Sequence, residues 1–190
     1  MFQIHRCKLL IRSLVLSVAL AGVPATVVAT TSAPANAADC SVSWGSLRET
    51  SDKSSRAKLV DIRAGRHRCF DRLVLDLNRR PTGYSVRYVR AVRQDGSGKL
   101  VRLRGRAQLE VVVQAPAHNN AGEPTYDPAN KRELVDVEGY RTFRQVAWAG
   151  DFEGQTTVGL GVRARLPFRA FTLRGPGKGS RLVIDVARHW

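Results

Sequence analysis

The sequence contains few cysteine and histidine residues, and this scarcity excludes several kinds of chemical site. Its 190 residues include only 3 cysteines and 4 histidines. His67 lies close to Cys69 in the sequence, which could indicate a zinc site. However, His67, Cys69 and Cys40 are too few ligands for such a site, and their spacing matches no known zinc motif. The sequence also has no Gly-x-Ser-x-Gly motif, no His-Glu-x-x-His motif and no P-loop. We therefore predict a protein that is not an enzyme and that holds no metal ion and no cofactor.

Acidic residues are scarce as well. The chain has 16 Asp and Glu residues against 31 Lys and Arg residues, which gives a formal net charge of +15. Of the basic residues, 25 are arginine and only 6 are lysine, and part of such an arginine excess can reflect the composition of the genome. The charge therefore suggests anionic partners without identifying them, and we expect no specific binding of nucleic acid.

The longest apolar run near the start of the chain is also short. Residues 14–21 are apolar apart from one serine, but a membrane anchor needs about 20 continuous apolar residues. Three basic residues precede this run, no acidic residue does, and an Ala-Asn-Ala sequence follows at residues 35–37. This pattern is typical of a secretory signal peptide, which we predict at residues 1–37. The mature protein would then be secreted, without an integral membrane segment, and able to associate with the cell wall.

Removal of residues 1–37 changes both the charge and the cysteine count. It takes away Arg6, Lys8 and Arg12 and no acidic residue, which leaves 28 basic and 16 acidic residues and a net charge of +12. Cys40 and Cys69 remain, and an even pair of cysteines in an exported chain predicts a disulfide. Closing a loop of about 30 residues stabilises a fold by roughly 3 to 4 kcal/mol in the chain-entropy model.

The remaining sequence divides into a Ser/Thr-rich leader at residues 38–56, tethered by that disulfide, and a strand-rich domain at residues 57–190. Apolar and polar residues alternate with period two through most of the domain, and Gly- and Pro-containing turns separate the runs. Many short strands with such turns predict an all-β fold, an antiparallel β-sandwich of two small sheets. The longest irregular segment runs from His118 to Asp136, and long loops on β scaffolds often carry function.

The alternation also predicts which residues share a strand face. The sets on a common face are Val60, Ile62 and Ala64; Leu73, Leu75 and Leu77; Tyr84, Val86 and Tyr88; Ala107, Leu109, Val111, Val113 and Ala115; and Thr156, Val158, Leu160, Val162 and Ala164. Further strands are expected at residues 143–149, 168–173 and 182–187.

One sequence pattern occurs twice. Residues 71–77 and residues 180–186 both contain Arg-Leu-Val, an aliphatic residue, Asp and another aliphatic residue. Any half-buried strand resembles this pattern, so the repeat has a simple explanation. Alternatively, the two strands occupy matched places in a sandwich with internal pseudo-symmetry.

Two stretches interleave basic and aromatic residues, which is a pattern that contacts sugar rings and anions. Each stretch is equally a strand with one core face and one solvated face. The candidate ligand-binding residues are Tyr84, Arg87, Tyr88, Tyr140, Arg141 and Trp148. Asp151 and Glu153 offer a carboxylate pair for a hydrolase, although an exposed loop explains them as well.

An ordered set of motifs extends over nearly the whole predicted mature chain. The motifs are Trp44-Gly45-Ser46, the run from Gly65 to Asp76, the run from Gly83 to Val89, the run from Leu109 to Val113, Phe152-Glu153-Gly154, Gly159-Leu160-Gly161-Val162, Leu166-Pro167-Phe168-Arg169 and the closing run from Arg181 to Val186. This set resembles the AMIN-like domain family of secreted actinobacterial proteins. The basic turn at residues 79–83 departs from the Pro-Gly turn expected there.

The resemblance implies a β-sandwich that binds or localises rather than catalyses. AMIN domains are associated with cell-envelope proteins and direct them to peptidoglycan or other envelope polymers, so we expect peptidoglycan or an anionic glycan as the partner. The alternative is an interaction subunit that docks on another envelope protein through a sheet edge or the long loop. The resemblance supplies no ligand residues.

Overall fold

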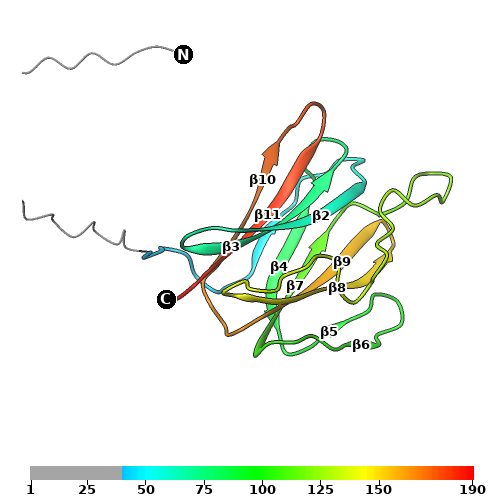
Figure 1. Ribbon diagram of the computed structural model, residues 1–190. Helices are drawn as coiled ribbons and strands as arrows, with labels where there is room; N and C mark the ends of the chain where they lie inside the picture. Colours follow the sequence, from blue (N-terminus) through cyan, green and yellow to red (C-terminus); the bar gives the residue numbers. More distant parts are fainter. Residues whose placement is uncertain (1–39) are drawn as a thin grey trace, which may run out of the picture. The chain divides into compact units, whose positions relative to one another are not determined.

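The computed structural model describes residues 40–190, so the predicted signal peptide lies outside the described residues. Within this range the chain forms strands and no helix (Figure 1). Consequently, the described part contains no helix long and apolar enough to cross a membrane. The strands are β1 (Glu49–Ser51), β2 (Leu59–Arg66), β3 (Phe70–Leu77), β4 (Tyr84–Val89), β5 (Val92–Arg93), β6 (Leu100–Val101), β7 (Ala107–Val113), β8 (Phe143–Phe152), β9 (Gln155–Val162), β10 (Phe168–Arg174) and β11 (Ser180–Ala187).

The strands form two main antiparallel sheets, which confirms the predicted sandwich. The five-stranded sheet has the order β1-β4-β7-β9-β8, and the four-stranded sheet has the order β10-β11-β3-β2. A short ribbon of β5 and β6 lies outside both sheets in the pairing scheme. The core lies between the sheets and contains their inward-facing residues, such as Leu73, Leu75 and Leu77 on β3 and Leu109, Val111 and Val113 on β7.

One predicted strand face is wrong at the start of β2. Val60 was expected to share a face with Ile62, but Val60 is exposed whereas Leu59 and Ile62 are both buried. The pairing of β2 with β3 shifts between Leu59 and Asp61, which marks a β-bulge. Because a bulge inserts one extra residue, it reverses the alternation and turns Val60 away from the core.

The repeated sequence pattern lies in two strands that pair with each other. In the antiparallel register of β3 and β11, Arg72 is opposite Asp185 and Asp76 is opposite Arg181. The arginine of each copy therefore faces the aspartate of the other copy. This reciprocal pairing relates the two copies within one sheet, and internal pseudo-symmetry of the sandwich stays a prediction.

The segment before β2 is attached to the domain at several points. Cys40 and Cys69 form the predicted disulfide, with their Cα atoms 5.1 Å apart. The guanidinium carbon of Arg169 lies 4.3 Å from the centre of the Trp44 ring. Residues 49–51 form β1, which pairs with the start of β4 and thereby extends the five-stranded sheet. The segment 40–51 is therefore packed on the domain and contributes a strand to it.

The long irregular segment between β7 and β8 covers a sheet edge. The backbone N–H of Leu134 donates to the carbonyl oxygen of Val146, and the N–H of Trp148 donates to that of Lys131. These hydrogen bonds pair the open side of β8, which is the last strand of the five-stranded sheet. An edge covered in this way is protected from pairing with another chain.

Candidate functional site

The structure does not bring the six candidate ligand-binding residues together. Tyr84, Arg87 and Tyr88 lie on β4, and Trp148 lies on β8, with β7 and β9 between these two strands. Tyr140 and Arg141 precede β8. Whether any of these residues binds a ligand stays a prediction, but they do not form one groove.

The tyrosines of β4 face the core. Both pack against the buried cluster, and burial raises the pKa of each phenol. The Tyr84 hydroxyl donates to the carbonyl oxygen of Ala170 at 2.8 Å, and the Tyr88 hydroxyl donates to that of Leu166 at 2.8 Å. Arg87, on the opposite face of the strand, forms an ion pair with Glu110. Of the two interpretations of this stretch, a strand with one core face therefore holds for β4.

The residues near β8 are also engaged by the protein itself. Tyr140 stacks on Phe143 with ring centres 5.8 Å apart, and Trp148 lies 6.0 Å from the ring of Tyr126. Arg141 is exposed. The aromatic rings near β8 are thus partly covered by neighbouring rings.

Asp151 is held by the long loop and does not pair with Glu153. Its Oδ2 atom lies 2.8 Å from Nδ1 of His118 and accepts a hydrogen bond from the backbone N–H of Ala117 at 2.8 Å. Glu153 occupies the turn between β8 and β9 with a positive φ of 50°. Within residues 40–190, no group of three or more His, Cys, Asp or Glu side chains could hold a metal ion.

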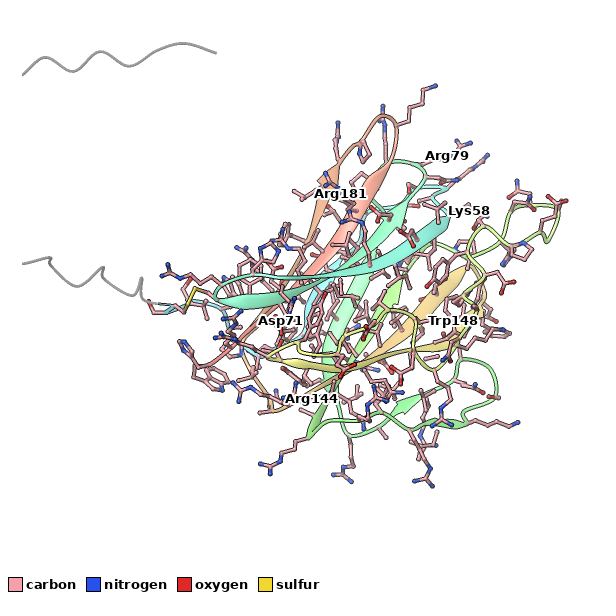
Figure 2. The ribbon with its side chains drawn as sticks, in the orientation of Figure 1. Lys58, Asp71, Arg79, Arg144, Trp148 and Arg181 are labelled. Atoms are coloured by element: carbon pink, nitrogen blue, oxygen red, sulfur yellow. A yellow bond between two sulfur atoms is a disulfide. The ribbon has the colours of Figure 1, made fainter. Side chains whose placement is uncertain are left out.

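A basic cleft lies at one end of the sandwich, where five loop segments meet. These are the approach to β2, the turn after β3, the segment after β7, the turn between β8 and β9 and the hairpin between β10 and β11. Two adjoining cavities of about 690 and 570 Å³ share Ser55, Arg56 and Arg79 as a common wall. Figure 2 places Lys58 and Arg79 toward the end that carries the β10–β11 hairpin. We call the two cavities together the basic cleft; its cationic residues are Arg56, Lys58, Arg79, Arg80, Arg174 and Lys178.

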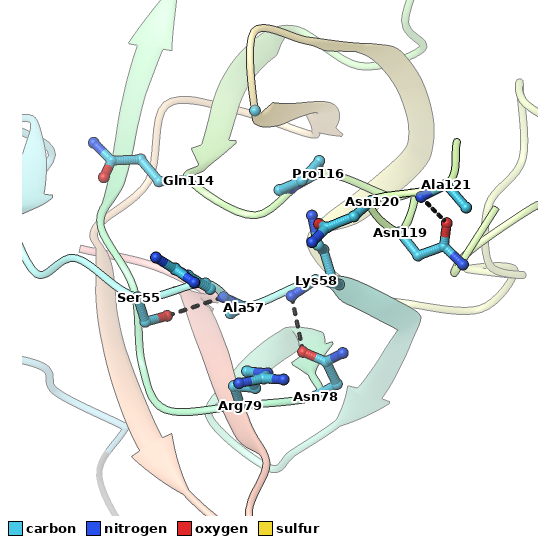
Figure 3. Close-up of a pocket in the computed structure, with 12 residues that line it drawn as sticks. Ser55, Ala57, Lys58, Asn78, Arg79, Gln114, Pro116, Asn119, Asn120 and Ala121 are labelled. Atoms are coloured by element: carbon cyan, nitrogen blue, oxygen red, sulfur yellow. Dashed lines mark hydrogen bonds between the residues drawn. The ribbon is translucent and has the colours of Figure 1, made fainter. Parts of the chain in front are cut away.

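Hydrogen bonds between side chains and the backbone fix the segments that form the cleft. The Ser55 hydroxyl donates to the carbonyl oxygen of Arg80, and the Ser180 hydroxyl donates to that of Arg79. The backbone N–H of Lys58 donates to Oδ1 of Asn78, a contact that Figure 3 shows beside Arg79. Gly179 lets the hairpin approach β3, because a Cβ at this position would lie 2.8 Å from the carbonyl oxygen of Leu77. The cleft therefore has a defined backbone even though most of its charged side chains are exposed.

The cationic head groups of the cleft have no partner within the described chain. None of the six forms an ion pair or donates a side-chain hydrogen bond there, and no acidic residue lines either cavity. Several arginines elsewhere are engaged: Arg144 donates to the carbonyl oxygen of Phe143, and Arg188 donates to that of His67. The cleft can therefore offer its charges to an external anion without first breaking an internal contact.

Sequence reasoning did not assign this cleft as a site, although two signals in the sequence pointed to it. The turn at residues 79–83 is unusually basic, and the Gly- and Pro-rich hairpin at residues 175–179 carries Lys178. Each signal alone is an ordinary exposed turn. Only the pairing of β3 with β11 brings these two turns to the same end of a sheet.

In a comparison with protein families, a family model described as the AMIN-like domain matches residues 57–188. No curated protein and no solved structure matches the chain.

Proposed function

This chain belongs to the AMIN-like domain family, and we propose that it is a secreted, non-catalytic module that binds peptidoglycan or an anionic glycan of the cell envelope. The family suggests a binding module related to peptidoglycan, of a kind that is typically extracellular or periplasmic. Our proposal adds the polymer class and places the contact in the basic cleft.

The observation that carries this proposal is the set of unpartnered cationic side chains in the cleft. Envelope polymers carry carboxylate and phosphate groups, and guanidinium groups bind both through paired hydrogen bonds. An arginine already bound to a carboxylate of its own chain would have to break that contact first. The cleft avoids this cost because no acidic side chain lines it.

Retention on purified cell walls tests the proposal. We expect the protein to sediment with walls in moderate salt, and we expect R56Q/R79Q/R80Q to lose about tenfold or more in affinity, because several charge-assisted hydrogen bonds disappear together. All three residues are exposed, so the variant should unfold at the same urea concentration as the unmodified protein.

A matched variant controls for net charge. Arg90, Arg102 and Arg106 are also exposed and form no ion pair within residues 40–190, but they lie in the segment that begins after β4 and leads through β5 and β6 to β7. R90Q/R102Q/R106Q should keep most of its retention. Equal losses in the two variants would refute the cleft as the site, and no retention of the unmodified protein would refute polymer binding. Stoichiometric crosslinking to an envelope protein would instead favour the alternative of a protein partner.

A further inference from the structure

The two cavities of the basic cleft have different chemical linings. The cavity of about 570 Å³ is lined by Arg80, Arg174 and Lys178. Its other lining residues are two glycines and the residues that both cavities share, Ser55, Arg56 and Arg79. The cavity of about 690 Å³ adds four side-chain amides, those of Asn78, Gln114, Asn119 and Asn120. The basic cleft therefore has a cationic half and an amide-containing half, which meet at the shared residues Ser55, Arg56 and Arg79.

Several of these amides are available to a ligand. The Asn119 amide is occupied, since its Nδ2 donates to Glu123 and its Oδ1 accepts from the backbone. Gln114 and Asn120 make no side-chain hydrogen bond within the described chain, and Asn78 uses only its Oδ1 atom. Free amides both donate and accept, so they suit hydroxyl groups, which do the same.

Neither cavity is lined by an aromatic side chain. Sites that bind neutral sugar rings through their faces, or single-stranded nucleic acid through its bases, use aromatic rings as stacking surfaces. The rings that sequence reasoning assigned to such contacts, Tyr84 and Tyr88, face the core instead. The cleft can therefore recognise charged and hydroxyl groups but offers no stacking surface to a ring.

From this geometry we infer the ligand class: an extended polymer of repeating phosphate groups joined by hydroxyl-bearing units, such as a polyol phosphate. One phosphate would bind Arg80, Arg174 and Lys178, and the next would bind the shared Arg56 and Arg79. The hydroxyl groups that follow the second phosphate would bind Gln114 and Asn120. The inference rests on the proposed function and names the polymer that the same cleft binds. A polymer that fills both halves gains affinity over a single phosphate because its contacts are linked.

The first experiment compares three probes by calorimetry with the purified protein: a short poly(glycerol phosphate), inorganic phosphate, and double-stranded DNA of equal total charge. We expect the polyol phosphate to bind at least about tenfold more tightly than either of the others, because only it fills both halves. DNA binding as tight as that of the polyol phosphate would overturn the inference in favour of unselective attraction to polyanions.

Two double variants test which half of the cleft binds phosphate groups and which half binds hydroxyl groups. R174Q/K178Q should weaken both the polyol phosphate and inorganic phosphate. Q114A/N120A should weaken the polyol phosphate about threefold and leave inorganic phosphate unchanged, because hydroxyl contacts are lost but the charges remain. An unchanged polyol phosphate affinity in Q114A/N120A would overturn the two-part cleft.

Binding to two preparations of cell walls tests this inference separately from the proposed function. Walls treated with hydrofluoric acid lose polymers attached through phosphodiester bonds and keep their peptidoglycan. We expect the protein to bind intact walls and to lose most of its retention on treated walls. Equal retention on both would refute the phosphate-polymer inference and leave peptidoglycan binding in place, whereas no retention on either would refute both.

Discussion

Asp185 is the most deeply buried charge in a network on the outer face of the four-stranded sheet. Its side chain is fully buried, and its oxygens bind Arg72 at 2.6 and 2.9 Å and Arg169 at 2.8 Å. Both arginines also lie against the Phe171 ring, with their guanidinium carbons 5.8 and 5.0 Å from its centre. The carboxylate therefore holds two guanidinium groups among aromatic rings. Partial burial of either group without a counter-charge would raise the free energy of the folded state.

We predict that D185N lowers the free energy of unfolding by about 3 kcal/mol, because it leaves two partly buried guanidinium groups without their carboxylate. Asp76 provides a matched control, since it pairs with Arg63, whose side chain is 51% exposed. D76N should cost at most about 1 kcal/mol, as is usual for an exposed pair. Urea unfolding measures both values, and equal losses would contradict the distinction between the two pairs.

Tyr126 predicts how stability changes in alkaline solution. Burial, together with the nearby charge of Asp61, raises the pKa of Tyr126 from 10.0 to about 12. Between these values the unfolded chain loses the phenolic proton and the folded chain keeps it, so stability is fully present below pH 10 and falls as the pH rises toward 12. Y126F should flatten this fall in urea midpoints measured from about pH 9 to about pH 11. A parallel decline in Y126F would contradict the assignment to Tyr126.

Single residues also show where sequence reasoning stops. Alternation correctly places Tyr84, Val86 and Tyr88 on one face of a strand, but it does not tell whether their rings face the core or a ligand. The answer depends on the carbonyl groups of Leu166 and Ala170, which belong to a segment about 80 residues away in the sequence and bind the two hydroxyls. The sequence equally does not show that the cationic side chains of the cleft lack partners, because ion pairs and hydrogen bonds depend on the folded structure.

At the level of elements, the long strands are the part that the sequence predicts well. β7 buries one regular stripe, and the larger apolar residues of β3 and β9 alternate along the strand even though β9 is buried on both faces, so the period-two pattern identifies all three. The short strands β1, β5 and β6 contain only two or three residues, which is too few to show a period. The bulge at the start of β2 is missed for a related reason, because an inserted residue breaks the pattern from which it would be inferred.

The disulfide and the packing of Trp44 both attach the segment 40–51 to the domain. We therefore predict what happens when the disulfide is lost. Reduction of the Cys40–Cys69 bond should lower the free energy of unfolding by about 3 kcal/mol, because the unfolded chain regains the freedom of a loop closed across 29 residues. The folded state should persist, since β1 and the Trp44–Arg169 contact do not depend on the bond.

Urea unfolding with and without a thiol reductant measures this loss. C40S/C69S should match the reduced protein and should not respond to the reductant. A β-sheet circular dichroism spectrum that disappears on reduction, before any urea is added, would contradict the prediction of a persistent fold.

Across the whole molecule, the basic residues divide into groups with different environments. Some pair with carboxylates on the sheet faces, such as Arg63 with Asp76 and Arg87 with Glu110. Others donate to backbone carbonyl groups, as Arg144 does. The six of the basic cleft do neither within the described chain, and they lie together along one cleft. Arg90, Arg102 and Arg106 also do neither there, but none of them lines the cleft. The net charge of +12 that remains without residues 1–37 can attract a polyanion from a distance. The unpartnered groups that lie together in the cleft can replace the counterions of that polyanion on contact.

This division predicts how wall binding depends on salt. Raising the salt concentration from about 50 to about 500 mM should weaken binding steeply. Salt screens the attraction between protein and polymer, and its cations compete with the arginine and lysine side chains for the anionic groups of the polymer. R56Q/R79Q/R80Q should bind more weakly and show a flatter dependence on salt, since fewer counterions are released when it binds. R90Q/R102Q/R106Q lowers the net charge by the same amount and should keep the slope of the unmodified protein. Sedimentation with walls across a salt series gives the three slopes, and equal flattening in both triple variants would show that net charge governs binding rather than the cleft.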